Sequence, residues 1–330
     1  MTGAPFDMGL TDPMTVVVHP NGHFVYVADG SDGSIHQWNV SEKTGVPTNI
    51  AAKVVNSSAS FYLPNGSGDS DTRVLAITPS GKYLYSGNND TKVGAYKINS
   101  NGSLSHIADL DLGACDTGAV AANDSFVWVT DTCGSSGPWN VFTMKIGSNG
   151  SLTKTGSVVL TSVFGWLWSI QINPAGNLLY VGDEGGTAQI YGFKVATDGS
   201  LTPITLGSST TQYQDNNSSD CRVIDFSPDG KFFYWSDDDD FVHSFSVDAT
   251  TGAIAELANS PYQDASSNPV GGPGQIVVDV TGKFVYVADQ DQTKGVIAFT
   301  RDAATGALTQ IGTTATVTAN SDPLAIGIIR

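Results

Sequence analysis

The sequence has little of several features that would place it in a common class of protein. Its 330 residues include 3 cysteines and 15 lysine or arginine residues, against 32 aspartate or glutamate residues. No apolar stretch is long enough to span a membrane, and no segment repeats apolar residues with the period of a helix. The formal net charge of −17 disfavours nucleic acid and anionic membranes as partners, because phosphate contacts need clustered lysine and arginine.

The few cysteines still carry information. Cys115 and Cys133 lie symmetrically about a predicted turn at Asn123-Asp124, and residues so placed on an antiparallel strand pair face each other. A disulfide between them would indicate an oxidising compartment, and the alternative is two independent thiols. Cys221 has no evident partner in the sequence, and no cysteine or histidine spacing is typical of a metal site.

The abundant feature is a repeat that occurs six times with a period of about 50 residues. A turn, which contains glycine in five of the copies, precedes an aromatic and β-branched strand, as in Gly282-Lys283-Phe284-Val285-Tyr286. An apolar strand comes before this turn, and an alternating strand and a polar outer strand follow it. Four-stranded antiparallel units that repeat in this way are the blades of an all-β propeller.

We therefore expect a single β-propeller domain over residues 1–330. Its complete repeats lie near residues 13–58, 72–108, 117–157, 167–207, 221–258 and 274–318. Residues 322–330 resemble the first strand of a further repeat, so the sequence predicts six complete repeats and a partial seventh, in a six- or seven-bladed propeller. Three interpretations stay open: a shortened seven-bladed protein, a six-bladed protein with the extra strand packed elsewhere, or self-assembly in which this strand completes a blade of a neighbouring subunit.

Acidic or amide side chains recur directly after the second strand of each repeat. They are Asp29, Asn88, Asp131, Asp183, Asp237 and Asp289. Aspartate and asparagine favour turns through local hydrogen bonds, and we prefer this interpretation. Asp131, Asp183 and Asp237 are at the same time candidate ligand-binding residues of this acidic face. The alternative is an acidic ring that binds Ca²⁺ through oxygen ligands, but no EF-hand spacing supports it, so we expect no metal or other cofactor.

Two arginines occupy one repeat position, six residues before a turn proline. Arg73 and Arg222 are predicted to enter first strands from the acidic face, where they suit a carboxylate or phosphate ligand. Pairing with loop aspartates is the alternative. Trp139, Trp166 and Trp168 are predicted on the same face, either to stack on a sugar ring or to fill the mouth of the propeller channel.

Two other recurring residue types have simpler interpretations. Tyrosines at one second-strand position are predicted to pack between blades rather than to bind a ligand: Tyr26, Tyr85, Tyr180, Tyr234 and Tyr286. None of the 5 histidines is placed as a general base, and no Ser-His-Asp order occurs.

The repeat, Pro-x-Gly-Lys-Phe-x-Tyr-Val followed by Thr-Gly-Ala-Leu-Thr, resembles the lactonase-like β-propeller family. That family includes propeller-type 6-phosphogluconolactonases and carboxymuconate cyclases, and the chain also resembles YVTN-repeat surface propellers. The resemblance covers nearly the whole chain and implies seven blades, a Pro-Arg-His motif at a first strand and a glutamate after the following strand. Arg73 and Arg222 match the arginine, Val74 and Val223 stand at the histidine position, and Glu184 matches the glutamate.

Three functions are consistent with these observations. The first is a secreted, non-catalytic propeller that binds a small molecule, a carbohydrate or a protein partner on its acidic, tryptophan-bearing face. The alternative is a lactonase-family hydrolase or cyclase acting on a small anionic lactone or sugar acid, with Glu184 as catalytic residue and Arg73 and Arg222 holding the anion. The third is a surface protein that self-assembles through residues 322–330.

The composition also leads to an expected location. Its serine, threonine, asparagine and glycine content resembles that of secreted bacterial propellers, which implies an extracellular or periplasmic protein. The first five residues show neither the basic segment nor the apolar core of a signal peptide, so we expect any such segment to have been removed.

Overall fold

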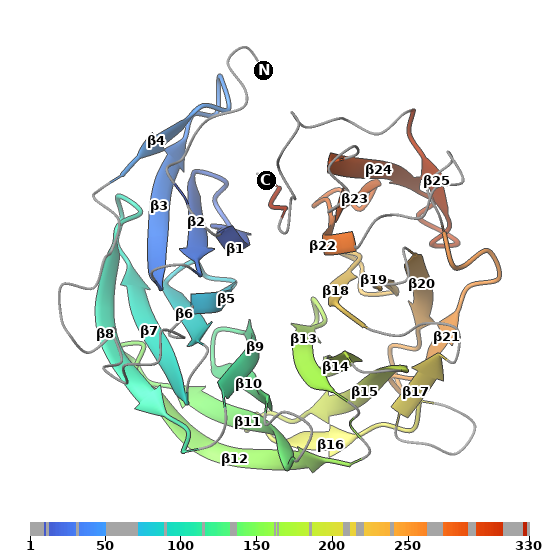
Figure 1. Ribbon diagram of the computed structural model, residues 1–330, viewed down its shortest axis with the longest axis horizontal. Coiled ribbons are helices and arrows are strands. Elements are labelled where there is room, and N and C mark those ends of the chain that lie inside the picture. Colours follow the sequence, from blue (N-terminus) through green and yellow to red (C-terminus); the bar gives the residue numbers. More distant parts are fainter. Residues whose placement is uncertain are drawn as a thin grey trace. The chain divides into compact units, whose positions relative to one another are not determined.

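The computed structural model of the chain consists of β-strands joined by turns and loops (Figure 1). It describes residues 10, 13–30, 33–50, 72–88, 91–113, 116–132, 137–161, 163, 165–184, 187–206, 212–215, 221–237, 241–262, 273–289, 295–312 and 326–328. Every regular element among these residues is a strand, and the strands form six sheets that follow the order of the chain. The expected four-stranded propeller blades are confirmed, and we number them blades 1 to 6.

The first three blades each contain four strands. Blade 1 consists of β1 (Pro13–Val18), β2 (Phe24–Asp29), β3 (Ser34–Val40) and β4 (Pro47–Asn49). Blade 2 consists of β5 (Thr72–Ile77), β6 (Tyr83–Asn88), β7 (Lys92–Ile98) and β8 (Leu104–Asp111). Blade 3 consists of β9 (Asp116–Ala122), β10 (Phe126–Thr132), β11 (Trp139–Ile146) and β12 (Leu152–Leu160).

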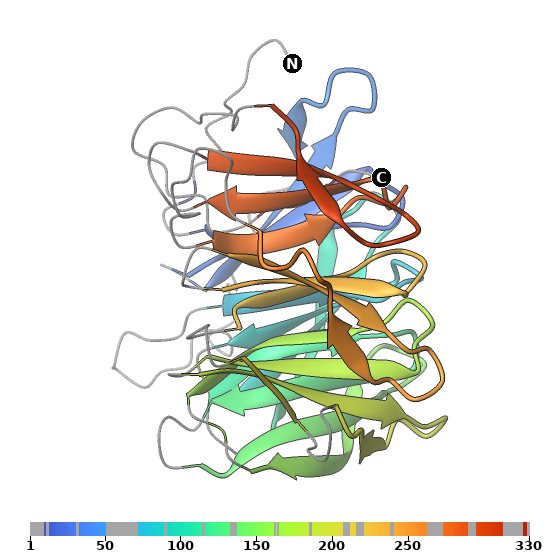
Figure 2. The ribbon, with the colours of Figure 1, turned by 90° about the vertical axis from the view of Figure 1, so that its right-hand side faces the viewer.

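The last three blades follow the same plan, with one added strand. Blade 4 consists of β13 (Trp166–Ile172), β14 (Leu178–Glu184), β15 (Ala188–Val195), β16 (Leu201–Pro203) and the additional β17 (Gln212–Asp215). Blade 5 consists of β18 (Val223–Phe226), β19 (Phe232–Ser236), β20 (Val242–Val247) and β21 (Ile254–Glu256). Blade 6 consists of β22 (Pro273–Val278), β23 (Phe284–Asp289), β24 (Gly295–Arg301) and β25 (Leu308–Gln310). The strands of blade 6, orange and red in Figure 2, lie side by side as their antiparallel register requires.

The chain groups into two compact units. The first comprises residues 1–131, 142–156 and 327–330, and the second comprises residues 132–141 and 157–326. Blades 1 and 2 belong to the first unit and blades 4 to 6 to the second, while residues of blade 3 occur in each. The candidate site described below is built from residues of the second unit.

The turn between first and second strands shows how the repeat folds locally. In blade 5 the turn contains Gly230, whose φ of +66° lies in the left-handed region that glycine enters at least cost. Blade 3 has no glycine there and closes the turn with a side chain instead. The Asn123 Oδ1 atom accepts hydrogen bonds from the backbone N–H groups of Ser125 (2.8 Å) and Phe126 (2.7 Å).

Four of the repeated tyrosines form hydrogen bonds between successive blades of the same unit. In the second unit the Tyr180 hydroxyl donates to the Gly252 carbonyl (2.7 Å) and the Tyr234 hydroxyl to the Gly306 carbonyl (2.8 Å). In the first unit the same bond joins Tyr26 to Gly102 (2.7 Å) and Tyr85 to Gly150 (3.1 Å). All four tyrosines are fully buried, so the prediction that they pack between blades is confirmed.

Hydrogen bonds also join the first strands of neighbouring blades in the second unit. The Ile224 N–H on β18 donates to the Ser169 hydroxyl on β13 (3.1 Å). The Asp225 carboxylate accepts from the Gln171 amide (3.2 Å) and from the Val278 N–H on β22 (2.8 Å). These polar contacts fix the lateral order of β13, β18 and β22.

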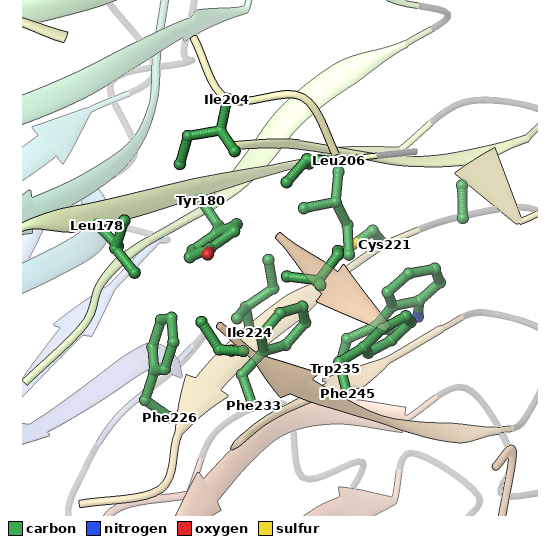
Figure 3. Packing of buried hydrophobic residues seen from close by; sticks show 14 residues of the cluster. Leu178, Tyr180, Ile204, Leu206, Cys221, Ile224, Phe226, Phe233, Trp235 and Phe245 are labelled. Carbon is green, nitrogen blue, oxygen red and sulfur yellow. The ribbon is translucent and has the colours of Figure 1, made fainter. Parts of the chain in front are cut away.

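Blades 4 and 5 share an apolar core that includes Cys221, the residue before Arg222. Figure 3 shows Tyr180, Phe226, Phe233, Trp235 and Phe245 packed together, with aliphatic side chains of both blades around them. The Phe233 and Phe245 rings stack at 4.9 Å, and the Trp235 and Phe245 rings at 5.3 Å. A close-packed aromatic core holds the strand ends above it in fixed positions.

Some sequence predictions concern residues that lie wholly or partly outside those that the structure describes. Cys115 and Cys133 lie outside them, so the predicted disulfide stays a prediction. Of the proposed extra strand, residues 326–328 are described, and they are not in a strand. The Ile326 N–H donates to the Gln275 side chain (3.2 Å), and Gly327 lies close to Val16 and Val18.

Candidate functional site

The candidate site lies where β13 begins and β14 ends. Trp166, the first residue of β13, is paired in register with Glu184, the last residue of β14. A register irregularity between Trp166 and Ser169 separates this pair from the regular ladder. Trp166 and Trp168 are 48% and 39% exposed, and their rings meet edge to face at 6.5 Å. Such exposure is unusual for tryptophan and leaves aromatic surface beside Glu184.

The start of blade 5 comes close to the same strand ends. The Cys221 N–H donates to the carbonyl of Asp183 (3.1 Å), the neighbour of Glu184. The next residue, Arg222, donates its N–H to the Ser236 carbonyl at the end of β19 (3.0 Å). This approach depends on Gly182, because a Cβ there would lie 2.5 Å from the Cys221 sulfur. The fold therefore brings Cys221, the residue before Arg222, to the residue before Glu184.

The repeated aspartates satisfy turns and loops. Asp183 and Asp237 are fully buried. The Asp183 carboxylate accepts a hydrogen bond from the Gly165 N–H (3.1 Å), and the Asp237 carboxylate accepts one from the Phe241 N–H (2.8 Å). The Asp237 bond is of the local kind that we preferred for this position, whereas the Asp183 bond holds the loop that precedes β13. Among the described residues, no three histidine, cysteine, aspartate or glutamate side chains are grouped as a metal site requires.

The other predicted site residues occupy separate places. Arg73 lies on β5 at a register irregularity in the first unit, and its side chain, like that of Glu184, is outside the described set. Asp131 is buried on β10, also in the first unit. Trp139 is half-buried on β11 and packs against Gly137, where a Cβ would lie 2.9 Å from its ring. Among the described residues, Trp166 is paired with Glu184 and contacts Trp168, while Arg222 follows the residue bonded to Asp183.

Sequence reasoning missed a buried polar cluster next to this site. The His243 ring on β20 is 2% exposed and lies between two carboxylates. Its Nε2 atom is 2.9 Å from the Asp237 Oδ2 atom, and its Nδ1 atom is 3.0 Å from the Glu256 Oε1 atom. The Glu256 carboxylate also accepts from the Ser260 hydroxyl (2.7 Å) and the Tyr213 hydroxyl (2.9 Å). We call these five residues the His243 cluster.

The register of the β19–β20 hairpin is the signal that would have found this cluster. His243 pairs with Trp235, two residues before Asp237, so a histidine near the start of the third strand lies beside the aspartate that ends the second. Blade 1 has a looser version, in which the Nε2 atom of His36 is 3.8 Å from the Asp29 carboxylate. The contacts described for His36 include one carboxylate. Those described for His243 include two, because Glu256 on the fourth strand of blade 5 is also within hydrogen-bond distance.

The two carboxylates change the titration of His243. Burial alone lowers the pKa of its imidazole, but hydrogen bonds and charge attraction from Asp237 and Glu256 outweigh that effect and raise the pKa to about 9. The hydrogen bonds from His243, Ser260 and Tyr213 lower the pKa of Glu256 despite its partial burial. At neutral pH the cluster therefore contains an imidazolium between two carboxylates.

Comparisons with known proteins support the fold and identify a family. A Lactobacillus plantarum protein is 18% identical with a TM-score of 0.71, covering 95% of this chain and 86% of its own. The Pseudomonas aeruginosa periplasmic gluconolactonase PpgL is 16% identical with a TM-score of 0.67, covering 88% and 82%. Kuenenia stuttgartiensis hydrazine synthase is 17% identical with a TM-score of 0.69, covering 100% and 93%. At these identities the likeness shows the fold alone. Hydrazine synthase, whose name indicates a different reaction, has the same fold.

Other comparisons add two findings. No curated protein matches the chain. None of the described residues belongs to a helix with the length and hydropathy that a membrane span requires. The family model described as Lactonase, 7-bladed beta-propeller matches residues 15–270 and 209–322. Because these matches cover most of the chain, and because its sheets are propeller blades, the protein belongs to the seven-bladed β-propeller lactonase family.

Proposed function

We propose that this protein is a lactonase-family hydrolase that opens the ring of a small anionic lactone derived from a sugar acid. The observation that carries the proposal is the exposed Trp166–Trp168 pair beside Glu184 and the Arg222 backbone. Family membership supports this function better than it supports a non-catalytic binding propeller. The structural similarity to a gluconolactonase agrees with it.

Trp166 and Trp168 supply the surface that binds the sugar ring. The apolar face of a sugar lactone stacks on an indole ring and covers surface that is otherwise in water. The Arg222 guanidinium binds the carboxylate or phosphate of the substrate through paired N–H donors. This arrangement favours an anionic substrate in a chain that is otherwise strongly acidic.

Glu184 acts as the general base in this proposal. Its carboxylate takes a proton from a water molecule, and the water oxygen attacks the lactone carbonyl carbon. The ring C–O bond then breaks, and the proton passes from Glu184 to the departing ring oxygen, which becomes a hydroxyl group. The products are the open hydroxy acid and the unchanged enzyme. Val74 and Val223 replace the family histidine, so proton transfer depends on Glu184 rather than on an imidazole.

The test is hydrolysis of a panel of lactones followed in a pH-stat. Glucono-δ-lactone and 6-phosphogluconolactone are the probes, and a lactone without hydroxyl groups, δ-valerolactone, is the comparison. The proposal expects turnover of the sugar lactones well above their spontaneous hydrolysis, with the phosphorylated probe preferred. Rates equal to spontaneous hydrolysis for every sugar lactone would overturn it.

The location belongs to the proposal as well. An extracellular or periplasmic lactonase fits the composition of the chain, and the gluconolactonase of similar structure is described as periplasmic. Fractionation of the native host, with the protein followed by antibody, tests this point: recovery with cytoplasmic markers would contradict it.

A further inference from the structure

The His243 cluster joins residues of blade 5 to one residue of blade 4. Asp237 follows β19, His243 lies on β20, and Glu256 ends β21, all in blade 5. Tyr213 comes from β17, the additional strand of blade 4. The hydrogen bond from the Tyr213 hydroxyl to the Glu256 carboxylate therefore links the two blades (2.9 Å).

β17 is a short strand in an unusual position. It pairs with β15 over residues Ala188 to Tyr191, while β16 pairs with the other end of the same edge at Phe193 to Val195. The Tyr213 ring packs edge-on against Phe245 at 5.1 Å and Trp235 at 6.3 Å, both in the core of blade 5. Tyr213 thus connects β17 to blade 5 by an apolar ring and by one charge-assisted hydrogen bond.

The position of β17 gives this link a consequence for the site. Its last residue, Asp215, precedes Arg222 by seven positions in the chain. The described part of the connection resumes at Cys221, whose N–H is held by the Asp183 carbonyl beside Glu184. β17 and the start of blade 5 are therefore each held by a described contact, β17 through the Tyr213 hydroxyl and Cys221 through the Asp183 carbonyl.

The charge of His243 decides whether the link is complete. Ionised carboxylates accept hydrogen bonds and do not donate them, so contacts of both ring nitrogens with carboxylate oxygens need both N–H groups of an imidazolium. A neutral ring donates to one carboxylate and turns a lone pair towards the other. The Trp235 ring, 4.5 Å from the imidazole, keeps it from turning away.

We propose that the His243 cluster is a proton-dependent fastening that holds β17 against blade 5 and supports the placement of Arg222, seven residues further along the chain. Loss of the His243 proton loosens Glu256, and with it the Tyr213 hydroxyl and β17. Asp237, Glu256 and Tyr213 are the titratable groups that contact or flank the ring in the described structure. The positioning of Arg222 rests on the proposed function, whereas the fastening of β17 does not.

The pKa shifts of His243 and Glu256 determine the pH range in which the fastening is intact. The pKa of His243 is raised to about 9 from 6.5, so its contribution is complete below 6.5 and is lost as the pH rises through 9. The pKa of Glu256 is lowered, so its contribution is present above the usual range of a glutamate and is lost as the pH falls. The fastening is therefore intact at neutral pH and fails in alkaline solution.

Hydrogen exchange of the full chain, read by mass spectrometry, tests the fastening. We expect protection factors of the amides in residues 212–215, corrected for the intrinsic effect of pH, to fall at least tenfold between pH 7 and pH 10. Tyr213→Phe keeps the ring and removes the hydroxyl, so its protection should already be about tenfold lower at pH 7, which corresponds to the loss of a hydrogen bond of roughly 1.4 kcal/mol. It should show little further loss at pH 10.

Tyr180→Phe is the matched control. It also removes a buried tyrosine hydroxyl, the one bonded to Gly252, but leaves the His243 cluster intact. This variant should keep the tenfold fall of the wild-type protein. Wild-type protection that is equal at pH 7 and pH 10, or a Tyr213→Phe variant with the full wild-type fall, would overturn the proposal.

Ligand binding tests the positioning of Arg222 separately from the fastening of β17. Calorimetric titration with D-gluconate at pH 7 should give a Kd at least threefold weaker for Tyr213→Phe than for Tyr180→Phe. Equal Kd values would refute the positioning of Arg222. If the wild-type protein does not bind gluconate, the proposed function and the positioning role fail together, while the exchange data still decide whether His243 fastens β17.

Discussion

At the scale of single residues, the blades are held in register by tyrosines that donate to carbonyl groups across the blade interface. The Tyr234 hydroxyl reaches the Gly306 carbonyl of the next blade at 2.8 Å, and the Phe232 ring covers the same glycine. The positive φ of Gly306 (+74°) turns its backbone towards the tyrosine. One aromatic pair and one glycine thus define the contact between successive blades.

Removal of one of these hydroxyls should destabilise the protein measurably. Tyr234→Phe leaves the Gly306 carbonyl without this buried donor, at a cost of about 1 to 3 kcal/mol in the free energy of unfolding. Tyr286→Phe is the control, because Tyr286 has the same repeat position but is only half-buried, and its hydroxyl makes no hydrogen bond with described residues. Urea denaturation should show a clear loss for the first variant and almost none for the second, and equal losses would contradict this account.

The glycine of the contact is required for a second reason. In Gly306→Ala the new methyl group would overlap the Phe232 ring, in addition to the strain of a positive φ. Gly176→Ala has nearly the same φ, +73°, but nothing lies within 4 Å of the added methyl group. We expect Gly176→Ala to cost about 1 kcal/mol and Gly306→Ala at least twice as much in thermal unfolding. A similar cost for both would mean that backbone strain alone determines the glycine.

At the scale of elements, β17 distinguishes this chain from a plain repeat. It adds a strand to blade 4 and carries Tyr213 into the core of blade 5. The sequence did not predict this strand, because four residues with two glutamines show no apolar alternation. The regular strands were predictable, since turn glycines and β-branched runs recur with the period of the repeat.

The His243 cluster should make stability fall at alkaline pH. The folded pKa of His243 is raised to about 9, so the free energy of unfolding should decrease between pH 6.5 and pH 9, by up to about 3 kcal/mol. His243→Gln removes this titration and should flatten the decrease, although it lowers stability at pH 6. Urea denaturation at pH 6, 8 and 10 measures both effects. A variant with the same alkaline decrease as the wild-type protein would show that another group is responsible.

At the scale of the whole molecule, the sequence predicts the repeat far better than it predicts the site. Six repeats in the sequence correspond to six four-stranded sheets, because each repeat contains its own turn and strand signals. Repeat position indicates Arg222, the resemblance indicates Glu184 and a local run of aromatic residues indicates Trp166, and the register between β13 and β14 brings the last two together. The sequence does not predict the His243 cluster, because Asp237 and Glu256, which contact His243, and Tyr213, which contacts Glu256, lie in three other segments of the chain.

The net charge is a property of the whole chain and predicts its solution behaviour. With 32 acidic side chains against 15 lysines and arginines, the protein is strongly anionic at neutral pH. Its charge approaches zero near pH 4, at about the pKa of free carboxyl groups, where repulsion between molecules disappears. Turbidity measured from pH 8 to pH 3 should therefore be greatest near pH 4 and should decrease again below it. A clear solution throughout would contradict this prediction.

The role of Glu184 is tested by measuring kcat and KM of three proteins, the wild type and two variants, on the sugar lactone that the wild-type enzyme hydrolyses fastest. Glu184→Gln removes the proposed base, and Glu42→Gln changes an exposed glutamate in the turn after β3 as a control. We expect Glu184→Gln to lower kcat by about 10² to 10⁴, and Glu42→Gln to retain wild-type kcat and KM. Wild-type turnover by the Glu184→Gln variant would contradict the assignment of Glu184 as the base that opens the lactone ring.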